Sequence, residues 1–191
     1  MAVPSQGTVA VGDKITASLW NDDVRDAVNF LISPPRVKVY KTANQSISYS
    51  TTAYSCLTWD AEAYDSDTMH SNTTSNSRIT FTTAGTYQIT LNCLWASVTD
   101  ATPGNRYHAI EKNGSTTFTS GSGSGFNIIE PFAVPNTNAT HQGTSITVNA
   151  SFSAGDYIQA FVLQTRGAGT ALNLSGSSES HSTFSARWIA S

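Results

Sequence analysis

Residues 86–95 read TYQITLNCLW, and apolar and polar side chains alternate from Thr86 to Cys93. One parity holds only apolar side chains: Tyr87, Ile89, Leu91, Cys93 and Trp95. Because successive side chains of a strand point to opposite faces, this period of two predicts a β-strand with one buried face. We expect the Cys93 side chain to point into the core.

The same period of two recurs in short stretches over most of the chain after residue 36. The clearest of these stretches are residues 37–39, 57–59, 78–81, 106–112, 146–152, 157–164, 172–174 and 184–188. Turn residues separate them, and Asn113-Gly114 predicts a hairpin that returns along 116–119. About eight to ten short strands with turns between them are typical of a β-sandwich or jelly roll. The sequence therefore predicts an all-β jelly-roll sandwich.

Residues 17–32, ASLWNDDVRDAVNFLI, follow a helical period instead. Thr16 or Ser18 can cap this segment, and Ser33-Pro34-Pro35 ends it because proline lacks a backbone donor. One apolar stripe runs along the predicted helix: Trp20, Val24, Ala27, Val28 and Leu31. The change of period at Pro34-Pro35 predicts a lead-in and helix over 1–35 and a β domain over 36–191.

The stripe on this short helix needs a surface to cover it, because an isolated helix of this length is marginal in water. The partner surface can belong to the β domain, to other copies of the chain or to a larger assembly. We expect residues 1–35 to serve attachment, with the stripe as the docking face.

Composition excludes several classes of protein. Charged residues make up 12% of the 191 residues, about half the usual share, and the net charge is −3. Without a basic stripe, nucleic acid is not an expected partner. No apolar run approaches the ~20 residues that span a bilayer, and the N-terminus lacks the pattern of a secretory signal. We expect a protein made in a cytoplasm, with no membrane insertion.

The cysteine count argues against a disulfide framework, since Cys56 and Cys93 are the only two cysteines. Two free thiols are the expected state, and a single bridge is the alternative.

Acidic residues cluster over 60–70, where carboxylate oxygens at alternate positions can hold calcium. The pattern lacks the glycine and the terminal glutamate of an EF-hand, so a polar loop with turn-capping aspartates is the preferred interpretation. If a metal does bind, Asp65, Asp67 and His70 are the candidate ligands. The letters G-x-S-x-G at 121–125 have no helix after them, and no acid–base pair stands out. We predict no enzymatic activity and no cofactor.

Residues 78–112 and 146–189 resemble the complement-type globular head and tumour-necrosis-factor-like jelly rolls. The shared features are AGTYQITLNCLW, a strand ending in Lys112-Asn113-Gly114, Ala154-Gly155-Asp156 between two strands, and a closing TFSARWI strand. Complement-type heads are trimers packed about a threefold axis, so the resemblance implies a homotrimer. Residues 157–164 are apolar on both faces, and we assign Tyr157, Phe161 and Leu163 to the trimer interface.

The segment ITASLWNDDVRDAVNFLISPPR resembles the N-terminal segment of many virion proteins of tailed bacteriophages, especially of actinobacteria. YDSDTMHS at 64–71 resembles a stretch found in the same proteins. The resemblance implies a virion structural protein that contacts other virion proteins and, through its exposed domain, a host cell-surface glycan. Of the possible positions on the particle, we prefer one in the minor tail or at the tail tip. A capsid decoration (head-fibre) position is the alternative, favoured by the lack of a long shaft. A soluble trimeric lectin-like ligand and a host-wall depolymerase are less favoured.

Overall fold

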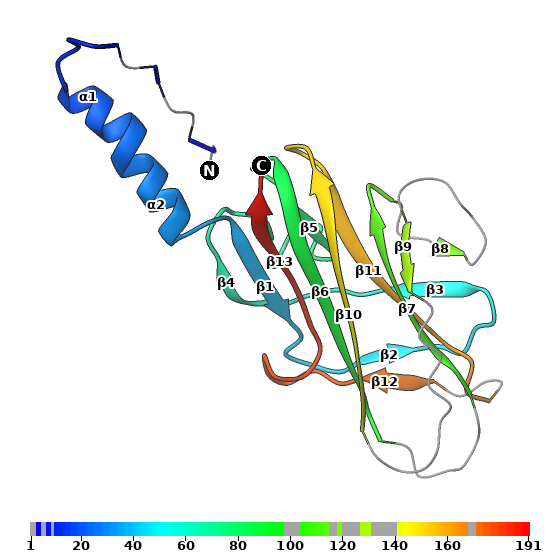
Figure 1. Ribbon diagram of the computed structural model, residues 1–191. Coiled ribbons are helices and arrows are strands. Elements are labelled where there is room, and N and C mark those ends of the chain that lie inside the picture. Colours follow the sequence, from blue (N-terminus) through cyan, green and yellow to red (C-terminus); the bar gives the residue numbers. More distant parts are fainter. Residues whose placement is uncertain are drawn as a thin grey trace.

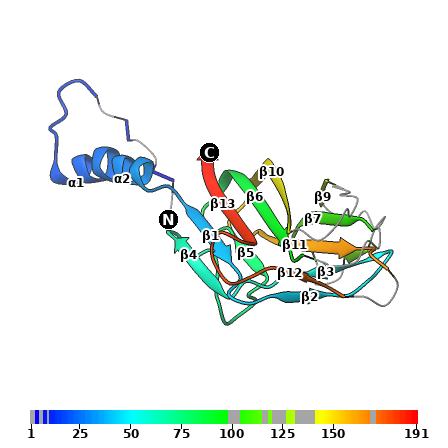
Figure 2. The ribbon, with the colours of Figure 1, turned by 90° about the horizontal axis from the view of Figure 1, so that it is seen from below.

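The computed structural model describes residues 3–4, 7–8, 10–97, 104–114, 118–119, 127–130, 141–167 and 171–191. Two β-sheets pack face to face, and one helical segment projects from them (Figures 1 and 2). The predicted all-β sandwich with a preceding helix is confirmed. The G-x-S-x-G letters at 121–125 lie outside the described residues.

Sheet A is centred on the strand that the sequence marks most clearly, β6 (Gly85–Trp95). On one edge of β6, β10 (Gln142–Phe152) pairs along the whole strand. On the other edge, β13 (Thr183–Ala190) pairs with residues 86–92 and β12 (Leu172–Leu174) pairs at Trp95. Beyond these lie β1 (Arg36–Tyr40) and β4 (Ala61–Asp65) next to β13, and β2 (Gln45–Ile47) next to β12.

Sheet B is centred on β11 (Tyr157–Gln164) and β7 (Arg106–Lys112), which pair antiparallel. On the free edge of β11 lie β3 (Ala53–Cys56) and β5 (Arg78–Thr80), and β9 (Asn127–Glu130) pairs with β7. The strand at Phe118–Thr119, β8, pairs with β3. The predicted hairpin from 106–112 to 116–119 is therefore wrong.

The core fills the space between the two sheets. Tyr87, Ile89, Leu91, Cys93 and Trp95 all point inward and are buried, as the alternation predicts. From sheet B, Ile158, Ala160 and Val162 face them. Aromatic pairs close one end of the core, where the rings of Phe81 and Phe152 stack at 3.9 Å between centroids. Burial of these side chains is the main source of stability.

The helical segment is continuous over the predicted residues 17–32. It comprises α1 (Ala17–Trp20), a π-helical stretch, η1 (Asn21–Arg25), and α2 (Asp26–Ile32). Of the two predicted caps, Thr16 is the one used, because its Oγ1 accepts from the backbone N–H of Leu19 at 3.2 Å. Within the described residues, no helix is long and apolar enough to cross a membrane.

Candidate functional site

The helix projects from the sandwich (Figure 1), and most of its apolar stripe is uncovered in the single chain. The exposed fractions are 56% for Trp20, 39% for Val24, 45% for Val28 and 74% for Leu31, and Ala27 is half-buried. Phe30 is the buried residue of the helix, and its ring packs edge-to-face on Trp188 of β13 at 4.8 Å. The helix is thus fastened to the sandwich at one end while its predicted docking face points into solvent.

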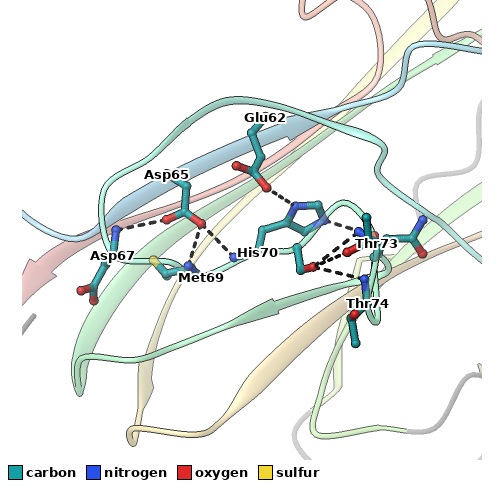
Figure 3. Close-up of polar contacts among 9 residues, drawn as sticks. Glu62, Asp65, Asp67, Met69, His70, Thr73 and Thr74 are labelled. Atoms are coloured by element: carbon teal, nitrogen blue, oxygen red, sulfur yellow. Dashed lines mark hydrogen bonds and ion pairs between the residues drawn. The ribbon is translucent and has the colours of Figure 1, made fainter.

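The acidic segment 60–70 contains β4 and the turn that follows it, and this turn is tightly hydrogen-bonded (Figure 3). The Asp65 carboxylate accepts three backbone N–H groups: those of Asp67 at 3.1 Å, Met69 at 2.7 Å and His70 at 2.9 Å. Carboxylates commonly cap turns in this way, because their oxygens replace missing backbone acceptors. Its own loop therefore takes three of the roughly four acceptor positions of the Asp65 carboxylate.

The other two candidate ligands are held in the same loop by different partners. The Asp67 carboxylate accepts from the hydroxyl of Thr83 at 2.7 Å, and the buried His70 ring contacts Glu62 Oε1 through Nδ1 at 2.9 Å. The His70 Nε2 atom faces the carbonyl oxygen of Asn76 at 3.3 Å. Among the described residues, no group of three or more His, Cys, Asp or Glu side chains is arranged to hold a metal ion. The geometry favours the turn-capping interpretation of this segment.

Strand β11 carries the residues assigned to a trimer interface. Phe161 and Leu163 are buried within the single chain, and Tyr157 is half-buried. Phe161 packs against Ala109, Tyr54 and Cys56 on the face of sheet B that points away from the core. Burial inside one chain accounts for the two apolar faces of β11 without a second subunit. The interface assignment itself stays a prediction.

Sequence reasoning missed a polar cluster inside the sandwich, at the end where β6, β7 and β10 meet. His108 Nε2 lies 2.8 Å from Thr144 Oγ1 and accepts from the Trp95 ring N–H at 3.4 Å. Arg106 lies over the Trp95 ring and donates to the Gln142 side chain. Burial, with a smaller contribution from the nearby Arg106 charge, lowers the pKa of His108 to about 4. The sequence offers one signal for this cluster, namely that these residues occupy the inward-facing positions of their strands. Which positions face inward depends on how the strands pair, and the sequence does not give that pairing.

Both cysteines are free, as expected. Cys93 is buried and Cys56 is half-buried. Burial raises the pKa of both thiols, so neither is a thiolate at neutral pH.

No protein-family model matches the sequence, and no curated protein matches it. Solved structures do match. The chain is similar to the globular domain of zebrafish complement 1qA protein, with a TM-score of 0.50 and 12% identity over 81% of this chain and 97% of that chain. Structures of murine APRIL at pH 8.5 and pH 5.0 align with a TM-score of 0.48 and 13% identity, over 81% of this chain and 98% of theirs.

At this identity the likeness shows the fold alone. The chain has a jelly-roll fold similar to that of the complement globular domain, so the fold that the resemblance implies is confirmed. The phage origin is not tested by these comparisons.

Proposed function

We propose that the chain is a non-enzymatic structural protein on the surface of a bacteriophage particle. The single observation that carries this proposal is the exposed apolar stripe on a helix that projects from the jelly roll. Apolar side chains gathered on one exposed helix face mark an interaction surface. The resemblance of this segment to phage virion proteins supplies the kind of partner.

In this proposal residues 1–35 attach the protein to the particle, and the domain 36–191 faces the medium as a homotrimer. The jelly-roll fold supports self-association through the trimeric state of complement-type heads. A minor tail or tail-tip position suits a small exposed domain that contacts the host surface. Capsid decoration is the second candidate, since the described chain contains no long shaft between helix and domain.

Enzymatic activity finds little support in the described side chains. In the acidic loop the Asp65 carboxylate accepts hydrogen bonds from backbone N–H groups. The thiols of Cys56 and Cys93 stay protonated at neutral pH. A depolymerase also needs a positioned acid and base, which the cluster around Asp65 does not supply.

The test is to locate the chain on particles. Antibodies against residues 36–191, detected with gold in electron micrographs of intact particles, should label the tail tip. Gold label distributed over the head would instead support capsid decoration. Purified particles free of the protein, or a coding sequence with no tape-measure or capsid gene near it, would overturn the virion role.

A further inference from the structure

An extra segment of chain lies beside the central strand of sheet A. Strands β12 and β13 run along the same edge of β6, with Leu174 opposite Trp95 and Thr183 opposite Asn92. On β6 only Cys93 and Leu94 lie between those positions, whereas the whole segment 175–182 lies between them on the other side. The excess chain must leave the plane of the sheet. It forms a loop, the 175–182 loop, over the face of sheet A that points away from the core.

This loop is fixed by hydrogen bonds on both sides. Its first residue, Ser175, donates its backbone N–H to the Leu94 carbonyl at 2.6 Å, and Ser182 Oγ accepts from the Leu94 N–H at 3.1 Å. Further in, the Ser177 N–H donates to the Lys41 carbonyl at 2.9 Å, and His181 Nδ1 lies 2.7 Å from the Gly176 carbonyl oxygen. A wall held in this way is preorganised, so a ligand does not have to order it on binding.

The loop and the sheet enclose a groove of about 390 Å³. Residues of the loop form one side, and side chains of β1, β6 and β10 form the floor and the other side. The polar residues that line the groove include Lys38, Asn92, Ser145, Glu179, His181 and Thr183. The volume lies within the range of about 300–1,000 Å³ that is common for small-molecule sites.

The chemistry of the lining selects one class of ligand. Lys38 and Glu179 oppose each other across 3.8 Å, so the two charges balance and neither a phosphate nor a free cation is favoured. Among the described residues, no Phe, Tyr or Trp and few apolar side chains line the groove, which disfavours an apolar ligand. Within the part of the chain that the structure describes, the Ser145 hydroxyl and the Asn92 side-chain oxygen make no hydrogen bond. The groove therefore offers both donors and acceptors, and its Lys38 and Glu179 charges balance.

We propose that this groove binds a neutral carbohydrate. Each sugar hydroxyl both donates and accepts, and the groove offers it both kinds of group: the Lys38 ammonium as donor, the Glu179 carboxylate and the Asn92 oxygen as acceptors, and the Ser145 hydroxyl as either. The proposal deepens the host-contact role and rests on it only for the source of the glycan. Because the described lining offers hydrogen bonds but no Phe, Tyr or Trp ring for a sugar to stack on, the affinity per site should be weak, with a dissociation constant on the order of 1 mM.

The experiment uses the full chain and an array of neutral and anionic glycans. Maltotriose, cellotriose and chitotriose serve as neutral probes, and 3′-sialyllactose and a heparin tetrasaccharide as charged probes. Calorimetry and saturation-transfer NMR then measure the binders in solution. Ser145→Leu, which fills the groove, and Glu179→Gln, which removes an acceptor charge, should each weaken binding about tenfold or more. Asn149→Leu is the matched control, because Asn149 is exposed on the same face of β10 outside the groove.

Several results would overturn the proposal. These are an array on which no neutral glycan binds, binding by anionic glycans alone, or Ser145→Leu binding as tightly as the parent chain. Dissociation of the oligomer by Ser145→Leu, measured by light scattering, would show that a second copy of the chain covers the groove instead. Groove-dependent binding by a protein that is missing from particles would leave this inference standing while the virion role fails. If the particles are labelled but the protein binds no glycan, the virion role stands and the carbohydrate proposal fails.

Discussion

Replacing Trp20 and Leu31 by alanine should release the protein from its particle without unfolding it. Docking can bury only the surface that is exposed in the single chain, which is 56% of Trp20 and 74% of Leu31. Full burial of one large apolar side chain contributes about 1.5–3 kcal/mol, so the two exposed portions together contribute about 2–4 kcal/mol. That free energy corresponds to a loss of roughly 30-fold to 1,000-fold in affinity for the docking site.

The assay compares copies of the protein per purified particle, measured by quantitative immunoblotting against a major capsid protein. Far-ultraviolet circular dichroism and the melting temperature of the isolated variant should match the parent, because neither side chain belongs to the buried core. Asn29→Ala is the matched control, since Asn29 is an exposed polar residue on the same helix.

Incorporation of the double variant at the normal copy number would refute the reasoning. It would mean that the stripe is not the docking face and that attachment depends on another part of residues 1–35. A variant that loses incorporation and also melts earlier would indicate that the stripe supports the fold instead.

Four further results are expected. Residues 36–191 alone should keep the β-type circular dichroism spectrum of the full chain, because Phe30 is the one helix residue that is buried and the helix thus contributes little to the core. Failure of this fragment to fold would show that the helix is part of the core. Light scattering should give the mass of a trimer at micromolar concentration, and a stable monomer would contradict this. The melting temperature should differ by less than about 2 °C between calcium and a chelator, since Asp65 is satisfied within its own loop; a larger rise, abolished by chelation, would show that calcium stabilises the native state. The pKa of His108 is about 4 in the folded chain and 6.5 in the unfolded chain, so on acidification the unfolded chain takes up a proton at a higher pH than the folded chain does. The free energy of unfolding should therefore fall by about 2–3 kcal/mol between pH 6.5 and 4. Urea titrations should show this loss in the parent and not in His108→Gln, and equal slopes in the two proteins would contradict it.

Features that depend on neighbouring residues could be predicted from the sequence. The helix over 17–32 follows from a period of apolar residues, a capping threonine and two prolines, and all of these act within a few residues of one another. The inward parity of Tyr87 to Trp95 follows from strand geometry in the same way.

Pairing between distant segments could not be predicted in this way. Asn113 does adopt the left-handed conformation that the motif favours, with a φ of 53°, but its side chain binds Asp156 at 2.7 Å and the N–H of Tyr157 at 2.8 Å. The turn residue is thus used to join β7 to the start of β11, and β7 finds β9 and β11 as its partners. A dipeptide motif indicates that the chain turns and does not fix the strand to which it returns.

The two surfaces that carry the proposals differ in the same respect. The stripe is a property of one helix, so its residues can be read in order along the chain, and among the described residues no helix or strand covers it. The groove exists because β12 and β13 share one edge of β6 and the segment between them is longer than the gap it spans. Ser145 and Glu179 meet across this groove although more than thirty residues separate them, and nothing local relates the two. An attachment helix can therefore be sought in related sequences by pattern, whereas a ligand groove of this kind has to be sought in the register of the sheet.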